Sequence, residues 1–156
     1  MRMANYFCDS SGIVKRYVWE AGSDWIATIT DPSTGHTILI ARVTVAEVVA
    51  AFWKKVREGV ITAEEARAFT QEFMEHMRVQ YLVLEVTAEV VKEAVRLIER
   101  HGLRGYDAIQ LAAATLLHRR RQQIGLPPLI FVSADEELLA AAQAEGLVTE
   151  NPNQKP

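Results

Sequence analysis

The stretch Tyr6-Phe7-Cys8-Asp9-Ser10-Ser11, near the N-terminus, decides the fold that we predict for this chain. Its first three residues are apolar, and so short an apolar run with two aromatic residues is typical of a buried strand. Residues 10–12 end the strand, and residues 13–19 then show helical spacing. Asp9 therefore lies at a strand-to-helix junction, and such junctions form the ligand-binding edge of a parallel α/β sheet. Asp9 or Ser10 could equally act only as the cap of the following helix.

The bulk composition indicates one globular domain. The chain has 156 residues, 49% hydrophobic and 24% charged, which is enough to bury a core. We expect a single domain over residues 1–150 and a frayed polar tail over residues 151–156. No apolar run approaches the roughly 20 residues of a membrane span. Cys8 is the only cysteine, which rules out an internal disulfide and favours a cytoplasmic location.

The net charge of −3 bears on the possible partners. Proteins that bind nucleic acid by neutralising phosphates are usually basic. If this protein acts on nucleic acid, the attraction must come from a local group of cations or from a bound metal ion.

Strand and helix patterns alternate along the whole chain. Short apolar runs predict four further strands, at residues 37–41, 79–86, 129–132 and 147–149. Three Ser/Thr-x-x-Glu patterns predict capping boxes at helix starts, namely Thr44 with Glu47, Thr62 with Glu65, and Ser133 with Glu136. This order predicts an α/β domain whose mainly parallel sheet, of four or five strands, is covered on both faces. Two helices between the second and third strands would form a small helical lobe.

Four carboxylates are expected to meet at one edge of this sheet. Asp9 and Asp135 each end a strand, and Glu47 and Asp107 each lie in the first turn of a helix. Strand ends and the helix starts that follow them share one edge of a parallel sheet. Taken singly, Asp9, Asp135 and Glu47 could serve only as helix caps. Asp107 is harder to explain in this way, because it shares a face with Leu111 on a largely apolar helix and a buried carboxylate is costly when unsatisfied.

A divalent cation would relieve the repulsion between these carboxylates. An all-oxygen set suits Mg²⁺ or Mn²⁺, whereas zinc calls for His or Cys ligands. We expect Asp9, Asp107 and Asp135 to bind Mg²⁺ (or Mn²⁺), and Glu47 to complete the catalytic set. Three neighbouring hydroxyls could support this site or serve only as caps: Ser10, Ser11 and Ser133. A metal held in this way favours hydrolysis of a phosphodiester, and the sequence contains no nucleophile elbow, P-loop or glycine-rich dinucleotide motif.

The same segments resemble the PIN-domain family, and within it the VapC-type ribonuclease toxins of toxin–antitoxin pairs. The resemblance extends from Tyr6 to about Val148, and its most specific part is Leu103-Arg104-Gly105-Tyr106-Asp107-Ala108-Ile109-Gln110-Leu111-Ala112. The other segments that carry it are residues 7–11, 44–47 and 131–135.

The resemblance implies a three-layer α/β/α sandwich and a metal-dependent endoribonuclease that hydrolyses RNA. It also implies an acidic set and a supporting hydroxyl, which are Asp9, Glu47, Asp107, Asp135 and Ser133. Toxins of this family are typically homodimers, and each is inhibited by an antitoxin segment that covers the site.

Basic and aromatic residues divide into two groups. Four cations near the carboxyl edge are candidates for contact with phosphate or with an antitoxin: Lys15, Arg16, Arg42 and Arg104. The basic run 118–121 lies about 20 Å from Asp107 along the same helix, so we interpret it as charge that favours a helix C-terminus. The tryptophans are expected in the core or at a dimer interface: Trp19, Trp25 and Trp53.

Two other functional classes remain open from the sequence. A catalytically silent PIN fold could serve only in assembly or binding. A receiver-like signalling domain also gathers acids at strand ends, but it needs a lysine on a late strand, and no lysine lies between Lys92 and Lys155.

Overall fold

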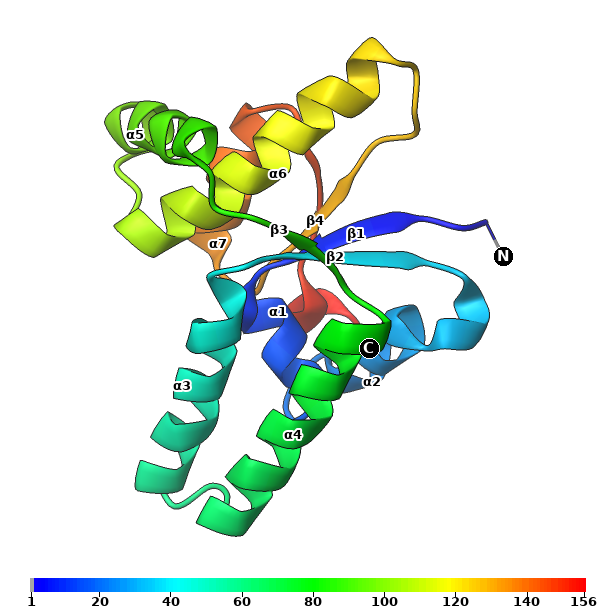
Figure 1. Ribbon diagram of the computed structural model, residues 1–156, viewed down its shortest axis with the longest axis vertical. Coiled ribbons are helices and arrows are strands. Elements are labelled where there is room, and N and C mark those ends of the chain that lie inside the picture. Colours follow the sequence, from blue (N-terminus) through cyan, green and yellow to red (C-terminus); the bar gives the residue numbers. More distant parts are fainter. Residues whose placement is uncertain (1) are drawn as a thin grey trace.

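A computed structural model describes residues 2–156, and a parallel β-sheet forms its centre (Figure 1). Within these residues the strands are β1 (Asn5–Cys8), β2 (Thr37–Ala41), β3 (Leu82–Leu84), β4 (Ile130–Val132) and β5 (Val148–Glu150). Every neighbouring pair is parallel, and the spatial order is β3-β2-β1-β4-β5. The predicted parallel sheet is therefore confirmed, with its fifth strand at an edge.

In the described part of the chain, α-helices cover both faces of the sheet (Figure 1). They are α1 (Ser10–Ile13), α2 (Ser23–Thr30), α3 (Thr44–Arg57), α4 (Ala63–Val79), α5 (Ala88–His101), α6 (Gly105–Gln123) and α7 (Glu136–Ala144). One buried cluster joins the sheet to α5, α6 and α7, and a second joins it to α1 through α4. The fold is thus the predicted three-layer α/β/α sandwich.

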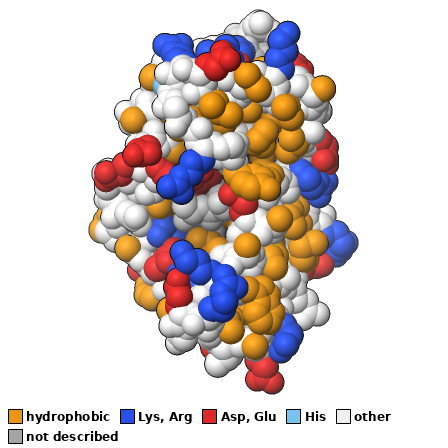
Figure 2. Space-filling model, turned by 90° about the vertical axis from the view of Figure 1, so that its left-hand side faces the viewer, with side chains coloured by type: hydrophobic (Ala, Val, Ile, Leu, Met, Phe, Trp, Pro, Cys, Tyr) orange, Lys and Arg blue, Asp and Glu red, His pale blue; other side chains and the backbone are white. Residues whose placement is uncertain are grey.

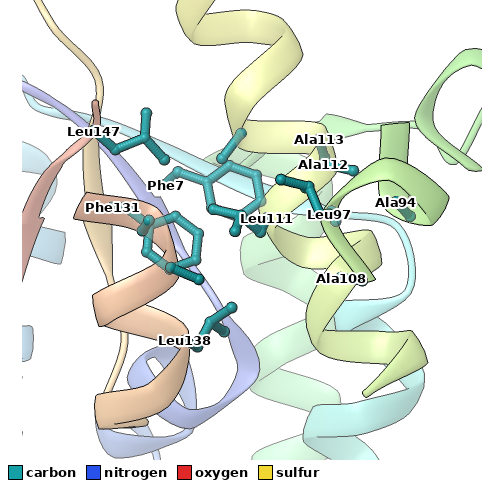
Figure 3. Close-up of a cluster of buried hydrophobic side chains, with 14 of the residues drawn as sticks. Phe7, Ala94, Leu97, Ala108, Leu111, Ala112, Ala113, Phe131, Leu138 and Leu147 are labelled. Carbon is teal, nitrogen blue, oxygen red and sulfur yellow. The ribbon is translucent and has the colours of Figure 1, made fainter. Parts of the chain in front are cut away.

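The alternation of side chains along β1 links the two clusters. Phe7 points into the cluster with α5, α6 and α7, whereas Cys8 points into the other cluster, because successive strand residues face opposite sides of a sheet. Figure 3 shows Phe7 beside Phe131 of β4, with Leu111 of α6 packed against them. The two rings are stacked with their centroids 5.6 Å apart. These contacts fix the end of β1, and hence Asp9, relative to α6.

The predicted helical lobe consists of α3 and α4, which project from the sheet as an antiparallel pair (Figure 1). Thr62 and Glu65 form the predicted capping box at the start of α4. The Glu65 carboxylate accepts a hydrogen bond from the backbone N–H of Thr62 at 2.9 Å, and the Thr62 hydroxyl accepts one from the N–H of Glu65 at 3.1 Å. Because α4 continues to Val79, β3 is shorter than the predicted strand at 79–86.

The structure corrects the predicted first helix. Instead of one helix over residues 13–19, α1 ends at Ile13 and a 3₁₀ turn follows at Val14–Arg16. The apolar residues of these two short turns face the core, which produces the helical spacing without a continuous helix. Trp19 lies beyond the turn and is 74% exposed, so the prediction that allowed it a place in the core is wrong on that point.

The C-terminal residues are ordered against the domain and do not form the expected frayed tail. A 3₁₀ turn covers Pro152–Gln154, and the side chain of Asn151 caps it by accepting a hydrogen bond from the backbone N–H of Asn153 at 2.9 Å. The ammonium group of Lys155 lies 5.1 Å from the ring centroid of Trp25 on α2. Contacts with α2 therefore hold this polar segment in place.

Gly22, which directly precedes α2, packs closely against this segment, and we expect Gly22→Ala to destabilise the protein. Gly22 has a φ of +87°, and an added Cβ would lie 2.4 Å from the carbonyl oxygen of Pro152. The free energy of unfolding in urea should fall by more than about 1 kcal/mol. Gly59→Ala is the matched control, because Gly59 also has a positive φ of +74° but has no atom within 4 Å of the added Cβ. Equal losses in the two variants would contradict the close packing described here.

The basic run at the C-terminal end of α6 makes contacts within the protein. Arg119 forms an ion pair of 2.7 Å with Glu93, and Arg120 forms one of 2.8 Å with Glu89, both on α5. Arg121 donates to the carbonyl oxygen of Pro127. The run therefore has structural contacts, which are ion pairs with α5 and hydrogen bonds to a backbone carbonyl. Across residues 2–156, no helix has the length and apolar character needed to span a membrane.

Candidate active site

Strand order places the end of β1 at a position suited to ligand binding. After β1, the chain adds β2 and β3 on one side of it and then β4 and β5 on the other. Crevices at the carboxyl ends of strands, where the order reverses in this way, are the usual ligand sites of open α/β sheets. Asp9 directly follows β1, and Ser133 directly follows β4.

Asp9 is almost fully buried and is held by three donors. One carboxylate oxygen accepts from the backbone N–H of Gly12 at 2.9 Å and from the hydroxyl of Ser11 at 2.7 Å. The other accepts from the hydroxyl of Ser133 at 2.6 Å. Burial raises the pKa of Asp9 to about 6 despite these donors, and the charge of Glu47 adds to the rise. Asp9 does cap α1, as the simpler interpretation allowed, but its second oxygen has no role in that cap.

Glu47 lies in the first turn of α3 and is half-buried. One of its carboxylate oxygens accepts a hydrogen bond of 2.7 Å from the side-chain amide of Gln110, and the other accepts a long one of 3.4 Å from the hydroxyl of Ser10. Burial raises the pKa of Glu47 above its usual value, and the charge of Asp107 contributes. The predicted capping box with Thr44 is absent, because Val43 is the helix cap and the carboxylate turns toward α6 instead.

Asp107 and Asp135 complete the acidic row. Asp107 is half-buried in the first turn of α6, where burial and then the charge of Asp135 raise its pKa, while Arg104 opposes the rise. Asp135 caps α7 by accepting from the backbone N–H of Leu138 at 3.1 Å. Asp135, and not the predicted Ser133, is therefore the cap of this helix, because Ser133 turns toward Asp9.

The four carboxylates lie near enough for the charge of one to act on the next, and we call them the carboxylate row. Glu47 acts on the pKa of Asp9, Asp107 on that of Glu47, and Asp135 on that of Asp107. Among residues 2–156, no group of three His, Cys, Asp or Glu side chains is placed closely enough to hold a metal ion as it stands. The donor chemistry nevertheless suits a hard divalent cation, because the row offers only oxygen atoms and neighbouring negative charges help to raise the pKa of Asp9, Glu47 and Asp107.

A cleft of about 640 Å³ opens beside this row. Its polar lining comes from Glu47, Asp107 and Arg104, and its apolar lining comes mainly from α5. Figure 2 views the side of the molecule that carries α3 and α5, where acidic and basic side chains surround a hollow and apolar side chains form a band beside it. The exposed ring of Tyr106 also lines the cleft.

The four predicted cations have different environments. Lys15 is buried and forms an ion pair of 3.1 Å with Glu20, and Arg16 donates to Gln80, Tyr81 and the carbonyl of Thr30. These internal contacts correct the expectation that Lys15 and Arg16 are free to meet a ligand. Arg42 is exposed and pairs with Glu85, whereas Arg104 is exposed at the cleft itself.

Gln110 and Thr44 are site residues that we did not predict. The amide nitrogen of Gln110 donates to Thr44 at 2.7 Å as well as to Glu47. Both residues are almost fully buried. One signal was present in the sequence, because Gln110 follows Asp107 by three residues and so shares its helix face. Its partner on α3 lies 63 residues away in the chain, and spacing alone does not indicate that contact.

Comparison with known proteins agrees with this architecture. The profile of the PIN domain matches residues 6–145. Ribonuclease VapC3 of Pyrobaculum aerophilum is 32% identical over 107 residues, which cover 68% of this chain and 78% of that protein. Ribonuclease VapC45 of Mycobacterium tuberculosis is 31% identical over 141 residues, which cover 90% of each. The chain belongs to the PIN-domain family.

A solved structure supports the same fold. A toxin–antitoxin complex from Klebsiella pneumoniae contains a chain that superposes with a TM-score of 0.62 at 16% identity, covering 94% of this chain and 97% of that one. At this identity the similarity concerns the fold.

Proposed function

We propose that this protein is a metal-dependent endoribonuclease of the VapC type, the toxin of a type II toxin–antitoxin pair. The proposal rests on the row of four carboxylates at the carboxyl ends of the strands, where the strand order reverses beside β1. Burial and mutual repulsion raise the pKa of Asp9, Glu47 and Asp107, and perturbed carboxylates beside a cleft are typical of catalytic sites. The two VapC ribonucleases at 31–32% identity support RNA as the substrate.

The residues divide into roles by their environments. Asp9, Asp107 and Asp135 would hold Mg²⁺ (or Mn²⁺), which when bound supplies positive charge that activates water and offsets the charge developing on the phosphodiester. Glu47 carries a raised pKa and faces the cleft, so it is suited to accept the proton of the attacking water. Ser11 and Ser133 orient Asp9 through their hydroxyls, and Ser10 supports Glu47.

The cleft also suits a protein inhibitor. Its apolar wall along α5 and its acidic end at Glu47 and Asp107 would accept a segment that carries apolar side chains and one basic side chain. The toxin–antitoxin complex with the same fold supports a cognate antitoxin as the partner. Arg104 at the rim is the cation best placed to meet either RNA or an acidic antitoxin side chain. We further propose a homodimer, as is typical of family toxins, and a cytoplasmic location, where RNA substrates occur.

Cleavage of a structured RNA tests this proposal. Purified wild-type protein should cleave it with Mg²⁺ or Mn²⁺, and Asp107→Asn should lower the rate by at least about 1000-fold, the scale on which one member of a catalytic unit acts. Asp24→Asn is the control, because Asp24 is exposed on α2. Full activity of Asp107→Asn would overturn the mechanism. An RNA that stays intact with wild-type protein and either metal would favour the alternative of a catalytically silent PIN fold.

A further inference from the structure

Gln110 is a polar residue in the most apolar part of α6. Its side chain is 1% exposed, and its neighbours Ala108, Leu111 and Ala112 are fully buried. A leucine or methionine would fill the same space without a polar group to satisfy. The presence of an amide here therefore requires an explanation beyond packing.

The hydrogen bonds of this amide are unequal. Its nitrogen donates twice, at 2.7 Å to the hydroxyl of Thr44 and at 2.7 Å to the carboxylate of Glu47. Its oxygen is buried and has no hydrogen-bond partner within the described residues. An ionised carboxylate only accepts hydrogen bonds, so the nitrogen must face Glu47. The unpaired oxygen is thus the cost of directing the N–H groups at α3.

Glu47 has no comparable second donor. Among residues 2–156, the hydroxyl of Ser10, at 3.4 Å, is the only hydrogen-bond donor to its other carboxylate oxygen. The amide of Gln110 therefore fixes the direction in which Glu47 points and favours its ionised form. We propose that Gln110 is a positioning residue that holds Glu47 at the cleft for RNA hydrolysis. This inference rests on the proposed ribonuclease activity and assigns a residue to it.

A purely structural bridge between α3 and α6 makes a different prediction from a positioning role. A bridge contributes to stability through its hydrogen bonds to Thr44 and Glu47 and leaves turnover unchanged, whereas a positioning residue acts on turnover through Glu47. Gln110→Met keeps the length of the side chain and removes both the donor and the unpaired oxygen. Thr115→Val is the matched control, because Thr115 is also buried in α6 and donates to a glutamate, Glu93, at 2.7 Å.

The first measurement compares the kinetics of RNA cleavage. Gln110→Met should lower kcat by about 10- to 100-fold with KM for the RNA unchanged, because the amide is buried and does not reach substrate. Thr115→Val should keep the wild-type kcat. In a Glu47→Ala background, Gln110→Met should cause no further loss. A wild-type kcat for Gln110→Met, or an equal fold-loss in both backgrounds, would overturn the proposal.

The second measurement needs neither metal nor RNA, so it stays informative if the ribonuclease activity itself is absent. Urea unfolding in chelator is followed for wild type, Gln110→Met, Glu47→Ala and the double variant. In the Glu47→Ala background, Gln110→Met removes an amide that has lost its carboxylate partner, so the unfolding midpoint should rise. In the wild-type background it should stay level or fall. The same shift in both backgrounds would show that the two side chains are not coupled, and would overturn the inference.

Discussion

Asp9→Asn should abolish RNA cleavage and at the same time leave the metal-free protein at least as stable as wild type at pH 7. The rate should fall by at least about 1000-fold, because Asn keeps the shape but not the charge of a central member of the catalytic unit. Asn is also a good helix cap, so the cap at the start of α1 should survive the substitution.

The gain in stability follows from the pKa of Asp9. Burial raises it from 3.8 to about 6 in the folded protein. A carboxyl group with a raised pKa favours the folded state at low pH, and that contribution is lost as pH rises from about 4 through 6. The loss amounts to about 3 kcal/mol at pH 7, and Asp9→Asn removes it.

Chemical unfolding of the metal-free proteins between pH 4 and 7 checks this prediction. The difference in unfolding free energy between Asp9→Asn and wild type should be small at pH 4 and should grow in favour of the variant as pH rises. Taking a difference isolates Asp9, because other groups titrate in both proteins. A variant that is less stable than wild type by the same amount at every pH would show that burial does not raise the pKa of Asp9.

Mn²⁺ should raise the thermal unfolding midpoint of wild-type protein by about 5 to 10 °C at a concentration of 100 times its dissociation constant. Binding at that level adds about 2.7 kcal/mol, and each kcal/mol shifts the midpoint of a domain of this size by about 2–4 °C. The physical reason is that the cation relieves the repulsion along the carboxylate row.

The same titration with variants locates the effect. Asp107→Asn should lose most of the shift, because Asp107 is half-buried and interacts electrostatically with both Glu47 and Asp135. Asp24→Asn should keep the full shift. An Mn²⁺ shift that is unchanged in Asp107→Asn would place the cation elsewhere on the protein.

Much of the fold followed from local patterns. The apolar run at Tyr6–Cys8 and similar runs at residues 37–41 and 129–132 identified the three central strands, because a strand buried on both faces is apolar throughout. The location of the site at one edge of the sheet then followed from a general rule, because parallel strands bring their carboxyl ends together. This is why Asp9 and Asp135, far apart in sequence, could be placed at one edge before the structure was known.

The incorrect predictions concern residue types that can serve either as helix caps or as members of the site. Ser/Thr-x-x-Glu is typical of a capping box, yet Glu47 turns to Gln110 and Ser133 turns to Asp9. Only the tertiary contacts decide between these outcomes, because a carboxylate satisfies a backbone N–H and a side-chain amide equally well. Lys15 is a further example. Its position in the sequence suggested a cation free to bind a ligand, but in the structure it forms an ion pair with Glu20.

The C-terminal segment illustrates a further limit of local reasoning. Two prolines and several polar residues indicated a frayed end, because such a composition buries little apolar surface. In the structure, Pro152 packs against Gly22, where the missing side chain leaves room for it. A glycine some 130 residues earlier in the chain thus makes room for this segment.

The most direct test of the central claim, that the carboxylate row is the metal-dependent active site of a ribonuclease, is the return of activity when metal is restored. Wild-type protein is stripped with chelator, and the rate of cleavage of one structured RNA is measured before and after Mg²⁺ or Mn²⁺ is added back. We predict no cleavage in chelator and full recovery with metal for wild type, with no recovery for Asp9→Asn. Cleavage at the full rate in chelator, or recovery by Asp9→Asn, would contradict the account.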